Sequence, residues 1–114
     1  MKTTNISFNL NTSNNTPENR SYSGRGSICY PFVVHRPKFD AHKFWTISHL
    51  ASGREAFRAK TLKDAQKLVN VLAKFPLFML PECHEFYRRC SNQSSTIIKT
   101  LENAGYNKAT MRFS

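Results

Sequence analysis

The stretch that decides the fold is Trp45–Phe75, which reads WTISHLASGREAFRAKTLKDAQKLVNVLAKF. Residues 44–50 alternate between apolar and polar side chains with the period of two that is typical of a strand. A turn follows at Gly53, since glycine readily adopts a positive φ, and residues 54–60 then return as a second strand. One face of the first strand is expected to carry Trp45, Ile47 and His49. The stretch therefore begins with a predicted β-hairpin.

A helix is predicted directly after the hairpin, from Leu62 to about Lys74. Thr61 is a favourable N-cap, and Asp64 stands where a capping-box acid would stand. Pro76 marks the end of the helix because proline has no backbone N–H. Apolar side chains recur at helical spacing and form one stripe, which consists of Leu62, Ala65, Leu68, Val69, Leu72 and Phe75. We expect this stripe to pack on the sheet.

The segments before the hairpin are less regular. Residues 1–27 are rich in Asn, Ser and Thr and are predicted to be a flexible arm. An ordered strand over the alternating residues 6–10 is the alternative. Residues 28–36 are predicted to form an edge strand, or a strand that begins near Phe32, because Pro31 cannot donate to a sheet ladder.

After Pro76 the pattern predicts helices at about 82–90 and 95–104 and a last strand beside the sheet within 107–114. Together with the hairpin and its helix, these segments predict a single α+β domain over residues 28–114. Its small antiparallel sheet, made of the β-hairpin plus one or two further strands, is expected to pack against two or three helices. The flexible arm would precede this domain.

The charge of the chain is strongly basic. Seventeen Lys and Arg side chains face seven Asp and Glu, so the formal net charge is +10 and the pI is about 10.0. Residues 36–74 hold nine of the basic and three of the acidic side chains, a net charge of +6. A small protein with this excess favours anionic partners, such as nucleic acid or an acidic protein surface.

The basic side chains of the hairpin and helix are the candidate nucleic-acid contacts. Helix lysines recur at spacings of four and seven and line the face opposite the apolar stripe, while the return strand carries arginines of the kind that grip phosphates. The predicted contacts are Arg54, Arg58, Lys60, Lys63, Lys67, Lys74 and His49. If the helix packs on the sheet, its lysines and the strand arginines form two basic surfaces on opposite sides, and we expect the hairpin surface to be the preferred one. Trp45 is expected in the core.

The order of these elements is similar to the arm-type DNA-binding modules at the start of tyrosine recombinases. The resemblance covers about residues 43–75 and rests on the turn glycine Gly53, the following Phe57 and the capped helix. Several double-stranded-RNA modules share parts of the same layout. The resemblance implies a sheet that approaches the major groove with the helix behind it.

Catalytic and metal-binding patterns are sparse. Asp40 with His42, and Glu82 with His84 and Glu85, are the nearest approach to a carboxylate or histidine cluster, and the glycines lack the P-loop pattern. The three cysteines are an odd number, which does not suit a disulfide framework. We expect no enzyme activity, no cofactor and no metal site.

The chain has no apolar run of about 18 residues and no secretory signal, so we expect a cytoplasmic protein that does not enter a membrane. The leading hypothesis is a small non-catalytic nucleic-acid-binding protein. The alternative is a protein-directed inhibitor or adaptor of the mobile-element type that docks on nucleic-acid-handling machinery. In that alternative, Phe78 and Met79 of the apolar segment 76–81 would contact the partner if they are exposed; the other interpretation is that they fill the core between the helices. The sequence leaves the oligomeric state open.

Overall fold

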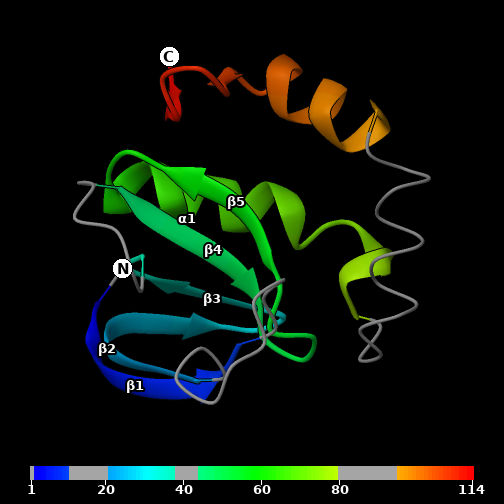
Figure 1. Ribbon diagram of the computed structural model, residues 1–114. Helices are drawn as coiled ribbons and strands as arrows, with labels where there is room; N and C mark the ends of the chain where they lie inside the picture. Colours follow the sequence, from blue (N-terminus) through cyan, green and yellow to red (C-terminus); the bar gives the residue numbers. More distant parts are fainter. Residues whose placement is uncertain (1, 11–20, 38–43, 80–94) are drawn as a thin grey trace.

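The computed structural model describes residues 2–10, 21–37, 44–79 and 95–114. Its main feature is a five-stranded antiparallel sheet in which the strands lie in the order of the sequence, β1-β2-β3-β4-β5 (Figure 1). The strands are β1 (Thr4–Asn9), β2 (Ser21–Cys29), β3 (Phe32–His35), β4 (Trp45–His49) and β5 (Glu55–Ala59). The sheet is thus a meander in which each strand pairs with its neighbour in the chain.

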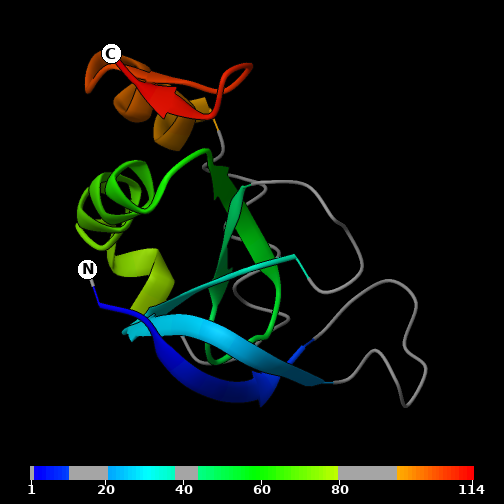
Figure 2. The same ribbon diagram turned by 90° about the vertical axis from the view of Figure 1, so that its left-hand side faces the viewer.

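Helix α1 (Leu62–Leu72) packs on one face of this sheet, as Figure 2 shows. The elements after it are the 3-10 helix η2 (Pro76–Met79), a helical segment at 95–103, and a short antiparallel pair formed by β6 (Tyr106–Asn107) and β7 (Arg112–Phe113). None of the described helices is both long and apolar enough to cross a membrane.

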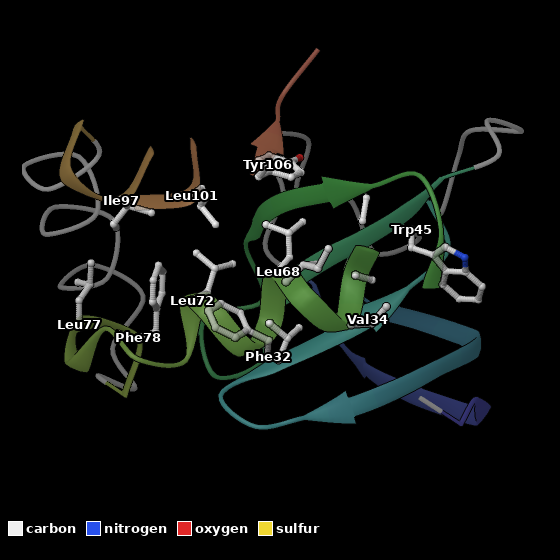
Figure 3. Close-up of a cluster of buried hydrophobic side chains, with 14 residues drawn as sticks. Phe32, Val34, Trp45, Leu68, Leu72, Leu77, Phe78, Ile97, Leu101 and Tyr106 are labelled. Carbon is white, nitrogen blue, oxygen red and sulfur yellow. The ribbon is translucent and has the colours of Figure 1, made fainter. Parts of the chain in front are cut away.

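The core lies between the sheet and α1 and extends to the C-terminal segment (Figure 3). Phe32 and Ile47 from the sheet and Leu68 and Leu72 from α1 are fully buried. Leu101 of the helical segment 95–103 belongs to the same cluster, so the C-terminal elements share one core with the sheet. Burying such side chains is the main favourable term in the folding of a domain of this size.

The start of α1 follows the capping rule. Thr61 has extended backbone angles, its Oγ1 accepts a hydrogen bond from Asp64 N at 3.1 Å, and its hydroxyl donates to Asp64 Oδ2 at 2.7 Å. One Asp64 oxygen also accepts from the backbone N of Phe113 at 3.2 Å. The predicted hairpin, the Thr61 cap and the helix are therefore confirmed, and Asp64 additionally ties α1 to β7.

The predicted edge position of the segment at 28–36 is wrong. β3 lies in the centre of the sheet, between β2 and β4, and it begins at Phe32 as one version of the prediction had it. Pro31 stands in the turn between β2 and β3, where its missing N–H removes nothing from either ladder.

The N-terminal region also differs from the flexible arm expected at 1–27, because residues 4–9 and 21–27 belong to β1 and β2. Aromatic packing accounts for this order: the rings of Phe8 and Tyr22 lie 4.9 Å and 4.6 Å from the ring of His35. The expected strand at 6–10 is realised as β1. Residues 11–20 lie outside the described residues.

The C-terminal predictions have mixed outcomes. Residues 95–103 are helical, which confirms the helix expected at 95–104, whereas the helix expected at 82–90 lies outside the described residues. The last strand pairs with β6 and not with the main sheet. The residue before it, Met111, accepts a backbone hydrogen bond at 2.8 Å from the N of Lys60, the residue that follows β5.

Candidate nucleic-acid interface

The basic side chains of the hairpin and of α1 lie on opposite sides of the sheet. In the β4–β5 register Phe57 pairs with Ile47, and both belong to the core on the α1 side. Arg58 is the next residue along the strand, so it points to the other side, where its guanidinium lies 4.9 Å from the ring centroid of Phe44. The exposed lysines of α1 face away from the sheet. One flat ligand cannot contact both groups, as the sequence predicted.

Exposed basic side chains occur along α1, just before its start and on the C-terminal strand β7. We call this set the helix–hairpin basic strip, where the hairpin is the β6–β7 pair; its members are Lys60, Lys63, Lys67, Lys74 and Arg112. Two contacts join its two halves, since Lys67 Nζ lies 5.8 Å from the Phe113 ring centroid and Lys60 N bonds to Met111 O. Arg112 lies between Met111 and Phe113 in the chain, so its backbone belongs to the segment that contacts α1.

Sequence reasoning missed Arg112, because nothing in the local pattern of residues 107–114 tells where the last strand docks. The signal that could have indicated it is Asp64, whose second carboxylate oxygen needs a partner from outside the helix and finds it in the Phe113 backbone. The four lysines of the strip were all predicted as contacts.

Two of the strip lysines, Lys63 and Lys67, stand at positions that do not favour helix stability. Lys63 stands in the first turn of α1, where the positive end of the helix dipole disfavours a cation. Lys63 and Lys67 are like charges at spacing i,i+4, which costs about 0.2–0.5 kcal/mol. Among the described residues no salt bridge joins any member of the strip, and the exposed acids are Glu55 and Glu102. The strip is therefore a concentrated positive surface that stability alone does not explain.

The arginines of the β4–β5 hairpin differ from the strip lysines in their contacts and burial. Arg58 Nε forms an ion pair with Glu55 Oε1 on the exposed face of β5, and its guanidinium also stacks on Phe44. Arg54 is half-buried beside the turn. The positive charge at Arg58 is thus partly compensated within the protein, whereas the strip cations have no such ion pair among the described residues.

His49 is not a surface residue, so its predicted role in nucleic-acid contact is wrong. Its side chain is 1% exposed. Nε2 lies 2.7 Å from Phe78 O and must donate, because a carbonyl oxygen only accepts, while Nδ1 accepts from Ser52 N at 3.2 Å and lies 2.8 Å from Ser52 Oγ. Desolvation by burial lowers the pKa of His49, although the bond to Phe78 O opposes this shift. His49 therefore acts as a neutral crosslink between the β4–β5 turn and η2.

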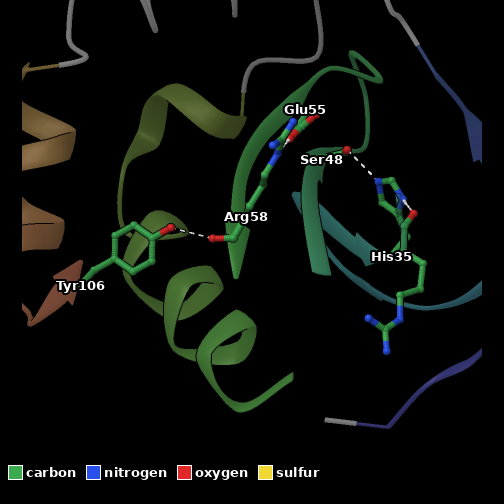
Figure 4. A network of polar contacts seen from close by, with 6 residues as sticks. His35, Ser48, Glu55, Arg58 and Tyr106 are labelled. Atoms are coloured by element: carbon green, nitrogen blue, oxygen red, sulfur yellow. Dashed lines mark hydrogen bonds and ion pairs between the residues drawn. The ribbon is translucent and has the colours of Figure 1, made fainter. Parts of the chain in front are cut away.

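His35 is a second buried histidine whose ring nitrogens are both hydrogen-bonded within the protein (Figure 4). His35 Nδ1 donates to Arg36 O at 2.7 Å, and Nε2 lies 2.8 Å from Ser48 Oγ. Burial lowers the pKa of His35 as well, against smaller raising effects from the Arg36 carbonyl and the Glu55 charge. Figure 4 also shows the Tyr106 hydroxyl, which donates to Arg58 O at 2.6 Å and ties β6 to β5. No local sequence pattern indicates these crosslinks.

Trp45 packs in the core, as expected, with one ring face turned to Arg36. The Arg36 guanidinium carbon lies 4.2 Å from the Trp45 ring centroid, and Nη1 donates to Phe44 O at 3.2 Å. A Trp ring already covered by a guanidinium is not open for base stacking.

The two residues proposed to contact a protein partner, Phe78 and Met79, differ in their exposure to solvent. Phe78 is fully buried, with its ring 4.9 Å from that of Phe32, so its predicted contact role is wrong. Met79 remains 51% exposed. Tyr30 is also exposed, at 61%. Tyr30 precedes Pro31, whose carbonyl oxygen accepts a hydrogen bond from Leu50 N at the β4–β5 turn. His49 links the same turn to η2.

A cleft of about 570 Å³ lies between β5, the helical segment 95–103 and the β6–β7 pair. Its apolar walls include Phe57, Ile97 and Ile98, and Arg58 and Lys108 also line it.

Among the described residues no three His, Cys, Asp or Glu side chains gather in a way that could hold a metal ion. The two clusters named from the sequence, Asp40 with His42 and Glu82 with His84 and Glu85, lie outside the described residues. Comparison with protein-family models, with curated proteins and with solved structures finds no match.

Proposed function

We propose that this protein binds nucleic acid without catalysis, through the phosphate backbone, and that the helix–hairpin basic strip is the contact surface. The observation that carries the proposal is the run of exposed lysines along one face of α1, with the exposed Lys60 and Arg112 on the segments that adjoin it, and no salt bridge to any of them among the described residues. Such a surface releases condensed counterions from a polyanion, which is the main source of affinity in non-specific nucleic-acid binding. A cytoplasmic location belongs to the same proposal.

The length of the strip suits a run of phosphates. Lys63 and Lys74 are eleven residues apart on α1 and its C-terminal extension, which is about 16 Å along the axis at 1.5 Å per residue. Phosphates on one DNA strand advance about 3.4 Å each along the duplex axis, so the strip spans about five of them. Flexible lysines recognise phosphate as point charges and do not select bases. We therefore expect low sequence specificity.

The test is a fluorescence-anisotropy titration of labelled duplex DNA, single-stranded DNA and RNA at low salt. Lys63→Gln/Lys67→Gln removes two strip charges, and Arg54→Ala/Arg58→Ala removes two hairpin charges as the matched control. The proposal expects at least a fivefold loss of affinity in the lysine variant and less than a twofold loss in the arginine variant. The reverse order would move the interface to the hairpin, and no binding by the wild type would end the proposal.

The second candidate is a protein-directed inhibitor or adaptor. The exposed Met79 and Tyr30 favour it, because large apolar side chains at the surface often mark protein contacts. Under this candidate Met79→Ser weakens partner capture while nucleic-acid affinity stays unchanged.

A further inference from the structure

The two edges of the main sheet differ in the hydrogen bonds that the other described residues make to them. At the β5 edge, Tyr106 donates its hydroxyl proton to Arg58 O and Lys60 N donates to Met111 O, so β6 and the segment before β7 cover that edge. β1 is the strand at the opposite edge. Within the described residues, the hydrogen bonds of its backbone run only to β2. Among the described residues, nothing pairs with the outward-pointing N–H and C=O groups of β1, which makes this edge a template for another strand.

The composition of β1 lacks the features that usually protect an open edge. Natural edge strands are kept apart by charged side chains, proline, bulges or very short length. β1 is six residues long, TNISFN, and has neither a charge nor a proline, and its register with β2 is regular throughout. Its side chains alternate between the exposed Asn5 and Ser7 and the half-buried Ile6 and Phe8. Such a strand is suited to continue the sheet.

The chemistry of the edge identifies the partner. A nucleic acid or an acidic protein would need cations at its contact; β1 itself has none, and the exposed Arg25 of β2 lies opposite Asn5, one strand in from the edge. Two copies of a chain with net charge +10 repel each other over most of their surface, so a neutral segment is where they can approach. An antiparallel pairing of β1 with itself is self-complementary about a two-fold axis, as closed dimers require.

We propose that two copies of this protein associate through their β1 strands into one continuous ten-stranded antiparallel sheet. Three of the six residues in each β1 direct their backbone groups outward, which allows about six new hydrogen bonds. Phe8 and Ile6 of the two copies would lie next to each other on the same face of the joined sheet. This association is independent of the basic strip, which lies on α1 and β7.

The test is sedimentation-velocity ultracentrifugation of the full chain from about 1 to 200 µM, with the variants Ser7→Lys and Ser23→Lys. Ser7 and Ser23 are directly opposite each other on β1 and β2 and are both exposed, so the two variants add the same charge one strand apart. In a centred register the two copies of residue 7 lie opposite or diagonal to each other, where like charges repel. The proposal expects a concentration-dependent dimer whose Kd rises about tenfold or more in Ser7→Lys and less than threefold in Ser23→Lys.

Hydrogen exchange of the wild type at 1 and 200 µM gives a second readout that needs no substitution. The proposal expects that amides of residues 4–9 gain protection at the higher concentration while those of α1 do not. A monomer over the whole range, or a dimer that both lysine variants weaken equally, would overturn the proposal. Either result would leave the nucleic-acid titration unaffected.

Discussion

His49 offers the sharpest test of whether the polar residues of the hairpin are structural or functional. The substitution His49→Ala removes the donor to Phe78 O and the acceptor for Ser52 N. An orphaned buried carbonyl costs about 1–3 kcal/mol, and the cavity left by a fully buried ring adds to this. We expect a loss of about 3 kcal/mol in the free energy of unfolding, which corresponds to about 12 °C or more in Tm for a domain of this size.

The assay combines thermal unfolding by circular dichroism with the anisotropy titration at 10 °C, where the folded variant still dominates. His49→Gln is the matched variant, because its amide N–H can still donate toward Phe78 O and should recover part of the lost stability. Nucleic-acid affinity should stay within twofold of the wild type for both variants. A Tm within 2 °C of the wild type, together with a large loss of affinity, would refute the structural role.

Three further predictions concern stability. Burial lowers the pKa of His35 and His49 below the ordinary value near 6.5, so the unfolded state binds more protons than the folded state. The free energy of unfolding should therefore fall as pH drops from about 7.5 to 5, and thermal melts that show an equal or higher Tm at pH 5 would contradict this. Thr61→Ala removes the α1 cap and should cost about 1 kcal/mol in urea unfolding, whereas Thr61→Ser should retain most of it; equal losses would argue against the cap. Tyr106→Phe leaves Arg58 O without its donor and should cost about 1 kcal/mol, and an unchanged urea midpoint would mean that this bond does not hold the C-terminal pair on β5.

The elements that the sequence predicted well are those whose signals are local. The β4–β5 hairpin, the Thr61 cap and the stripe of α1 depend on residues that are neighbours in the chain, so periodicity and capping rules describe them. The helix at 95–103 was found in the same way.

The features that the sequence did not predict depend on contacts between distant segments. Residues 4–9 and 21–27 looked like a flexible arm because few of their side chains are apolar, whereas in the structure they pair as strands and Phe8 and Tyr22 pack on His35. His49 looked like a surface base because histidine is polar, but its partner Phe78 stands 29 residues away in the chain. Arg112 joins the basic strip only through the docking of β7 on α1.

The most direct test of the central claim is the salt dependence of affinity for a duplex of about 20 base pairs. Five phosphate contacts predict that log K falls with log salt concentration with a slope of about −4.5, at about 0.9 per contact. In Lys63→Gln/Lys67→Gln the slope should weaken by about 1.8 units, whereas Arg54→Ala/Arg58→Ala should leave it unchanged. A slope that the lysine variant does not change, or affinity that is insensitive to salt, would contradict the assignment of the basic strip as the nucleic-acid interface.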